Sequence, residues 1–151
     1  MKYGILILRI AAVLWLIWGL VHIFAGVMTM GQVAQGSIAG AVHGITDLVE
    51  RSTLEIEYPY AVGAIISQHG WNLLWAGIAT TVGSFFVWRK NGLAIIVNAA
   101  VGGLFDMDYF LFIDLAGLSG PPGPQMTYIC ATAIVLSLYV YFKSDRLKNL
   151  A

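Results

Sequence analysis

The sequence has 151 residues, a length that suits one domain, and 59% of its residues are hydrophobic whereas only 11% are charged. Eight basic and eight acidic residues are too few to cover that much apolar surface in water, so the composition favours a membrane protein over a soluble domain. The net charge of zero gives no support for a nucleic-acid partner, and the single cysteine excludes an internal disulfide, a CxxC redox pair and a thiolate metal cage.

The first predicted element is an apolar run over about residues 4–27. A transmembrane helix needs ~20 apolar residues, and this run is too long for the apolar region of a typical signal peptide. We therefore expect it to be retained as the first span. Within it, Ala12, Gly19 and Gly26 recur at intervals of seven residues, which lines one helix face with small residues.

The next segment, residues 28–59, is more polar and is expected to lie outside the membrane. Its first part carries apolar residues at spacings of three to five, which is typical of one face of a helix. These residues are Val33, Ile38, Val42, Ile45 and Val49. The pattern predicts an amphipathic helix that lies on, or dips into, the outer membrane interface.

Three more spans are predicted over about residues 60–88, 92–115 and 125–142. The span over 60–88 is the longest and would have to tilt or protrude. It carries Gly63, Gly70, Gly77 and Ser84 at intervals of seven, so we expect it to pack tightly and antiparallel against the first span. The expected fold is an all-α integral membrane protein, a four-helix transmembrane bundle that forms one domain over residues 1–151.

The basic residues predict the orientation, because Lys and Arg concentrate on the cytoplasmic side of membrane proteins. With both termini inside, only Arg51 lies outside, and the other seven fall on or near the cytoplasmic side: Lys2, Arg9, Arg89, Lys90, Lys143, Arg146 and Lys148. We expect an N-in/C-in, multi-pass protein of the bacterial inner (cytoplasmic) membrane, with membrane lipids as partners.

Polar residues gather in the outer half of the predicted bundle. Ionisable residues inside a membrane are costly and by default face the bundle interior or a cavity. Counting ~1.5 Å per residue along each helix places the following at this level: His22, His69, Asn72, Asp106, Asp108 and Asp114, with His43 of the outer segment near enough to join them.

Asp106 and Asp108 are two residues apart, which is about 200° around an α-helix, so both cannot face one point. We expect one of them to enter the bundle core. Asp106 shares a track with Asp114, and Asp108 is expected to meet a second partner, a neighbouring subunit or the headgroup region.

Several functions remain open for this group. His22, His69 and Asp106 are candidate ligands for zinc, iron or manganese, although no HxxxH or ExxH element supports them. His22 and His69 are candidate axial ligands of a haem. His69 and Asp106 are candidate catalytic residues for proton transfer to a lipid-soluble substrate. Candidates for binding a small lipophilic ligand are His22, Asn72, Trp18, Asp108, Asp114 and His43.

An alternative of a different class assigns these polar residues to helix packing, because His, Asn and Asp can form hydrogen bonds between helices. The chain would then be a non-catalytic accessory or assembly subunit of a membrane complex. A homo-oligomer or a larger membrane complex is compatible with either function.

The stretch LRIAAVLWLIWGLVHIFAG resembles the opening helix of DoxX-like four-helix membrane proteins. The likeness consists of a Leu-Arg start and spaced glycines and covers one helix of four. It implies no role for any individual residue.

Overall fold

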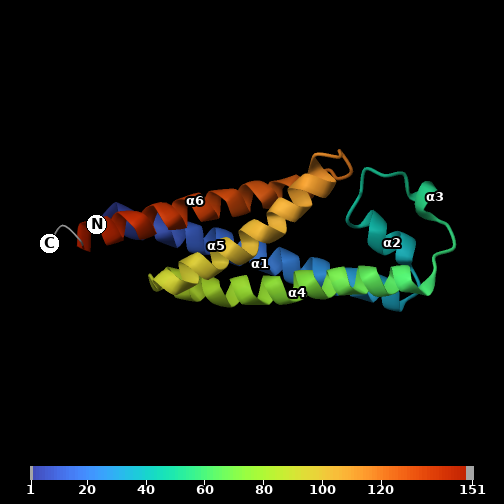
Figure 1. Ribbon diagram of the computed structural model, residues 1–151, viewed down its shortest axis with the longest axis horizontal. Helices are drawn as coiled ribbons and strands as arrows, with labels where there is room; N and C mark the ends of the chain where they lie inside the picture. The colour runs from blue at the N-terminus through green and yellow to red at the C-terminus, as the bar shows by residue number, and fades with distance from the viewer. Residues whose placement is uncertain (1, 149–151) are drawn as a thin grey trace.

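The computed structural model describes residues 2–148, with side chains over residues 3–143. Its helices are α1 (Lys2–Ala34), α2 (Ile38–His43), α3 (Arg51–Leu54), α4 (Tyr60–Trp88), α5 (Gly92–Tyr109) and α6 (Gly123–Lys148), and a π-helical turn, Phe110–Asp114, extends α5. This part of the chain contains no strand. The two termini and the α4–α5 connection lie at one end of an elongated bundle, and α2 and α3 lie at the other (Figure 1).

Three stretches are long and apolar enough to cross a membrane: Tyr3–Ala34, Gly92–Asp114 and Gly123–Lys143. This finding supports assignment as a membrane protein. The helix α4 has the predicted bounds but is not among the three. It contains no Asp, Glu, Lys or Arg, and its polar residues Gln68, His69 and Asn72 make it less apolar than a typical lipid-facing helix. A fourth span therefore stays a prediction.

The predicted outer segment, residues 28–59, differs from its predicted form. The helix α1 continues to Ala34, beyond the predicted end near residue 27. The backbone at Gly36 then adopts φ +78°, in the left-handed region that glycine tolerates and helices do not. Within the predicted amphipathic stretch, α1 ends at Ala34, and Ile38–His43 forms a separate short helix. The prediction of one continuous amphipathic helix was wrong, because Gly36 interrupts the apolar stripe after Val33.

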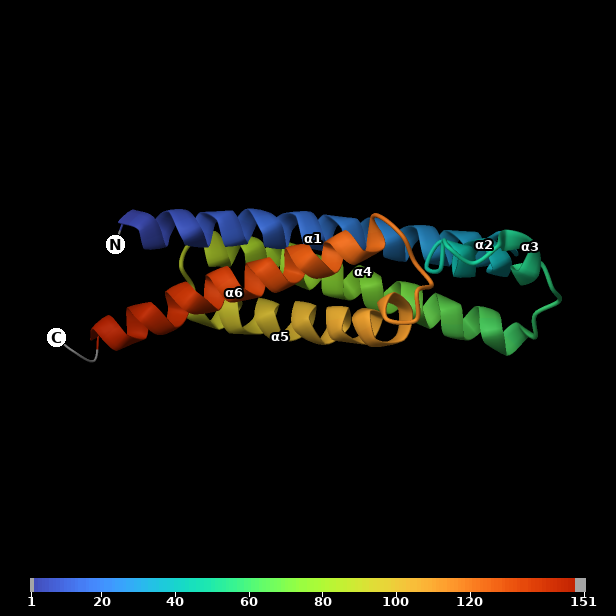
Figure 2. The ribbon, with the colours of Figure 1, turned by 90° about the horizontal axis from the view of Figure 1, so that it is seen from above.

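The helices α1 and α4 lie side by side over most of their lengths (Figure 2). A Cβ atom built on Gly77 would lie 2.6 Å from the carbonyl oxygen of Gly19, and one built on Gly26 would lie 2.5 Å from that of Gly70. Both distances are too short for any side chain, so the two backbones touch. The pairs 19–77 and 26–70 run in opposite directions, which confirms the predicted tight antiparallel packing.

The core forms where α5 and α6 pack against α1. Trp15 and Trp18 are both 0% exposed, and Cys130 of α6 is buried with them. A Cβ atom on Gly102 of α5 would clash with the Trp15 ring and lie 3.1 Å from the Cys130 sulfur. Because Gly102 has no side chain, the indole of Trp15 fits between α5 and α6.

Contacts at the two ends hold the remaining parts together. At the end of the bundle that carries the α4–α5 connection, the Arg9 guanidinium lies 5.0 Å from the centre of the Trp88 ring. At the opposite end, the Gly120 N–H donates to Asp47 Oδ1 (2.7 Å), which joins the segment between α2 and α3 to the α5–α6 connection. This hydrogen bond holds the pKa of Asp47 below its usual range, because it stabilises the charged form.

The backbone contact between α1 and α4 predicts that a methyl group added to a glycine of α1 changes stability by an amount that depends on its position. Gly19→Ala places its Cβ 2.8 Å from the Gly77 carbonyl oxygen and should destabilise the fold by about 1–3 kcal/mol, because the helices must separate. Gly31→Ala is the matched control. No atom lies within 4 Å of its added Cβ, and it should be neutral or stabilising by up to ~1 kcal/mol. Unfolding in detergent measures both, and equal effects would contradict the contact.

Candidate functional site

The centre of the site is the carboxyl group of Asp106, which lies on α5 and is only 7% exposed. The indole N–H of Trp18, on α1, donates to it, with Nε1 3.1 Å from Oδ1 and 3.0 Å from Oδ2. A carboxyl group buried in an apolar bundle is tolerated only when it is paired or hydrogen-bonded. The Trp18–Asp106 contact satisfies this requirement and ties α1 to α5.

His22 lies one turn beyond Trp18, and its ring stacks on the indole with ring centres 3.6 Å apart. Its Nδ1 lies 2.8 Å from the carbonyl oxygen of Trp18. A carbonyl oxygen only accepts, so Nδ1 must carry a proton. The other ring nitrogen, Nε2, faces Asp106 Oδ1 at 4.0 Å. This separation is too long for a hydrogen bond.

A third helix, α6, completes the cluster. The Cys130 thiol of α6 lies next to the Asp106 carboxyl group. On α1 itself, Trp15 meets Trp18 edge to face with ring centres 6.2 Å apart. The sequence predicts no functional role for Cys130. A lone cysteine in an apolar helix carries no pattern that identifies its neighbours, so only the packing of α6 against α5 reveals this contact.

The three aspartates occupy different environments, as their helical phase predicted. Asp106 is buried, whereas Asp108 is exposed on the opposite side of α5. Asp114 is half-buried in the π-helical turn. The separation of Asp106 from Asp108 is confirmed.

The remaining predicted residues lie outside the cluster. His69 is half-buried on α4, within electrostatic range of His22 and Asp108, and forms no hydrogen bond with the described residues. Asn72 accepts a hydrogen bond from Trp75 Nε1 of its own helix (3.2 Å). His43 Nδ1 lies 3.2 Å from the carbonyl oxygen of Val49, within the outer segment. The structure therefore brings together Trp18, His22 and Asp106.

The predicted metal centre at His22, His69 and Asp106 has no support. Over the described part of the chain, no three His, Cys, Asp or Glu side chains gather closely enough to hold a metal ion. His22 Nε2 and Asp106 Oδ1 lie 4.0 Å apart, but they remain a pair, because His69 does not join them in a group of three. The haem prediction lacks geometric support too, because Nε2 of His22 faces Asp106.

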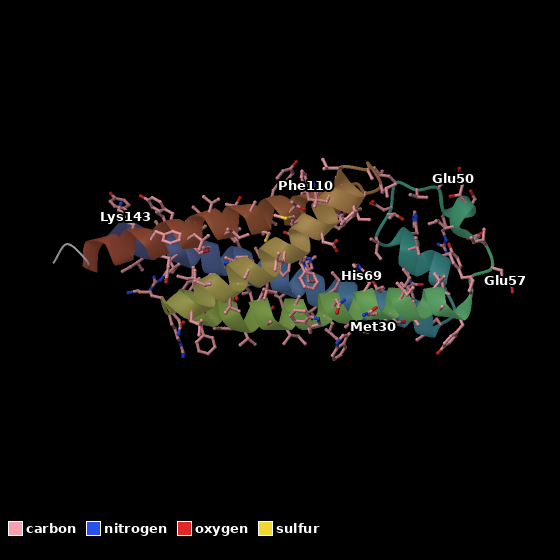
Figure 3. All side chains as sticks on the ribbon, viewed as in Figure 1. Met30, Glu50, Glu57, His69, Phe110 and Lys143 are labelled. Carbon is pink, nitrogen blue, oxygen red and sulfur yellow. The ribbon has the colours of Figure 1, made fainter. Side chains whose placement is uncertain are left out.

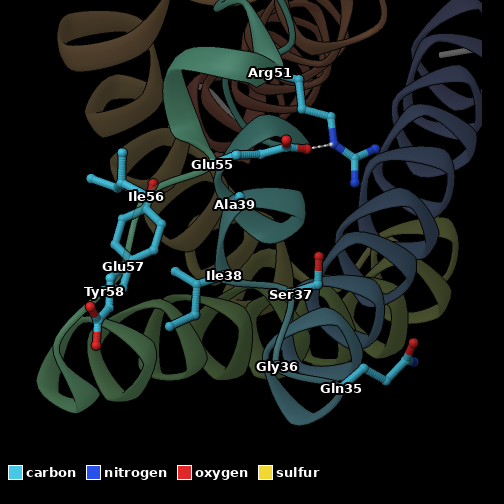
Figure 4. A pocket seen from close by; sticks show the side chains of 10 residues that line it. All are labelled: Gln35, Gly36, Ser37, Ile38, Ala39, Arg51, Glu55, Ile56, Glu57 and Tyr58. Atoms are coloured by element: carbon cyan, nitrogen blue, oxygen red, sulfur yellow. Dashed lines mark ion pairs between the residues drawn. The ribbon is translucent and has the colours of Figure 1, made fainter.

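An open polar pocket of about 510 Å³ lies in the outer segment, away from Asp106 (Figure 4). Residues from the end of α1, α2, α3 and the approach to α4 line it: Gln35, Gly36, Ser37, Ile38, Ala39, Arg51, Glu55, Ile56, Glu57 and Tyr58. Its one cation, Arg51, is paired with Glu55 at 3.4 Å. The expected continuous helix would not have formed this pocket.

No protein-family model, curated protein or solved structure matches the chain. The resemblance of the first helix to DoxX-like proteins gains no support from these comparisons. A function must therefore be inferred from the geometry of the Trp18–His22–Asp106 cluster.

Two buried tryptophans offer a matched test of the hydrogen bond to Asp106. Trp18→Phe removes the indole donor and should cost about 1–3 kcal/mol more stability than Trp15→Phe, because a buried carboxyl group loses a partner. The Trp15 N–H has no hydrogen-bond partner among the described residues, so its loss removes only ring volume. Chemical unfolding in one detergent measures the difference, and equal losses would show that the bond contributes nothing.

Proposed function

We propose that the chain crosses the membrane four times, with both termini in the cytoplasm of a bacterium and α4 as the second span. The helix α4 supports this because it has no charged residue and packs on α1 along the glycine seam. The distribution of charge supports the orientation. Lys143 lies toward one end of the bundle, whereas Glu50 and Glu57 lie at the other (Figure 3). The side chains of Lys2, Arg146 and Lys148 lie outside the described residues.

Single-cysteine labelling tests this topology in a Cys130→Ala background. A membrane-impermeant maleimide applied to intact spheroplasts should label Glu57→Cys, which is exposed in the outer segment. It should label Asn91→Cys, in the α4–α5 connection, only after permeabilisation. Labelling of Asn91→Cys in intact spheroplasts would reverse the orientation.

We further propose that the Trp18–His22–Asp106 cluster binds the polar head of a small lipophilic molecule and exchanges a proton with it. The observation that carries this proposal is the 4.0 Å separation between His22 Nε2 and Asp106 Oδ1. An oxygen atom placed about 2.8 Å from each would bridge them at an angle near 90°, within the normal length of a hydrogen bond. A hydroxyl group there donates to one partner and accepts from the other.

The roles of the two side chains follow from their existing bonds. Trp18 holds the Asp106 carboxylate in place, so that its charge attracts a donor. His22 is held by its Nδ1 bond and by stacking on Trp18, so that Nε2 alone is free to give or take a proton. The acid–base pair proposed here is therefore His22 with Asp106, in place of His69 with Asp106.

The approach from the membrane is proposed to lie between α4 and α5. Trp75 of α4 and Phe105 of α5 meet edge to face with ring centres 5.5 Å apart, which gives this side an aromatic wall.

A long-chain alcohol, 1-decanol, is the probe for this proposal. In phosphatidylcholine nanodiscs with ¹⁵N-labelled histidine, decanol should shift the Nε2 resonance of His22, which is assigned from the His22→Gln variant. The shift should vanish in Asp106→Asn and persist in Asp114→Asn, because Asp114 forms no hydrogen bond through its side chain with the described residues. An unchanged Nε2 resonance in the wild type, with decanol present in the bilayer, would contradict the site.

A second function, that of a non-catalytic accessory subunit, is supported by a different observation. The Trp18 indole occupies both oxygens of Asp106, which is what a helix-packing contact requires. Under this alternative, Asp106→Asn would lower stability as much as Trp18→Phe and decanol would have no effect on His22.

A further inference from the structure

One face of α5 is exposed and almost wholly apolar. Val97, Leu104 and Leu111 are spaced seven residues apart, all are exposed, and Leu104 is the most open of them at 70%. Asp108 lies between Leu104 and Leu111, spaced four and three residues from them, and is also exposed. We call these four residues the Asp108 face. Spacings of four and three keep a seam on one side of a helix against a partner helix.

Asp108 lies inside a membrane-spanning stretch. It falls within Gly92–Asp114, one of the stretches apolar enough to cross a membrane. Six residues, or about 9 Å along the helix, separate it from Asp114 at the outer end of that stretch. Its side chain forms no hydrogen bond or ion pair with the described residues. An exposed carboxylate at this depth faces lipid, which is costly unless a cation pairs with it.

A second copy of this chain does not supply that cation. The Lys and Arg residues of the sequence lie at the inner end of the spans, except Arg51, which is in the outer segment and is paired with Glu55. A two-fold axis normal to the membrane would also place Asp108 against Asp108 of the second copy. Like charges in apolar surroundings repel strongly, so a symmetric dimer formed through the Asp108 face is disfavoured.

The shape of the face favours a helix as the occupant. The pocket in the outer segment lies elsewhere, and the Asp108 face is a strip along one helix. Paired helices recognise each other through strips of this kind. The apolar positions at heptad spacing supply the packing contact, and the one charged position fixes the register of the two helices.

We propose that the Asp108 face of α5 docks a transmembrane helix of another membrane protein, and that a Lys or Arg of this helix pairs with Asp108 in the outer half of the bilayer. The Lys or Arg donates to the carboxylate, and the apolar residues above and below it pack on Leu104 and Leu111. If the chain is an accessory subunit, its proposed partner is therefore a transmembrane helix that carries a Lys or Arg. It does not involve the His22–Asp106 pair, so either proposal can fail without the other.

A synthetic helix can stand in for the partner in a binding experiment. The probe is a Leu/Ala transmembrane peptide with one Lys six residues from one end of its apolar stretch. Energy transfer in phosphatidylcholine vesicles measures its association with the full chain, labelled at Glu57→Cys in the Cys130→Ala background. The Lys peptide should bind about tenfold more tightly than the same peptide with Gln, a factor that corresponds to ~1.4 kcal/mol.

Three variants of the chain make the result specific. Asp108→Asn should remove the tenfold preference for Lys, whereas Asp108→Glu should keep it, because it retains the charge at the same position. Asp114→Asn is the matched control and should also keep the preference. Asp108 is exposed, so its variants should unfold like the wild type. Equal binding of the Lys and Gln peptides, or a preference that survives Asp108→Asn, would overturn the proposal and assign Asp108 to the lipid headgroups.

Discussion

A carboxyl group in an apolar interior must find a donor, and in this bundle the donor is the indole N–H of Trp18. Because Trp18 is on α1 and Asp106 is on α5, satisfying the carboxyl group joins two helices through residues that are 88 positions apart in sequence. The position of His22 follows from this contact, since its ring stacks on Trp18 and its Nδ1 bonds to the Trp18 carbonyl oxygen. The candidate site therefore follows from one requirement, which is that the buried Asp106 carboxyl group needs a hydrogen-bond donor.

The glycines of the bundle make that contact possible. At Gly19 and Gly26 the α1 backbone touches α4, and at Gly102 the α5 backbone leaves room for the Trp15 ring. In lipid, helices gain little from burying apolar side chains against each other, so close approach at small residues replaces the hydrophobic effect as the source of packing energy. Larger residues at these positions would move Trp18 away from Asp106.

Two acids separated by one residue have different environments in this chain. Asp106 faces the bundle core and Asp108 is exposed on the outside of the bundle, because each residue advances about 100° around an α-helix. The inward acid belongs to the candidate site of this chain. The outward acid is the basis for the proposed contact with another protein. A shift of one residue in the phase of α5 would expose Asp106 and destroy the site.

The sequence by itself determined the four long helices, and the predicted bounds of 60–88 match α4. It also determined the glycine seam between α1 and α4 and the phases of Asp106 and Asp108. These features depend on local periodicity, which a helix preserves. Tertiary structure alone decided that Asp106 pairs with Trp18, that Cys130 joins them, that the predicted metal ligands do not converge and that Gly36 breaks the outer helix. These outcomes depend on the distances between helices and on backbone angles, which residue spacing along one chain does not encode.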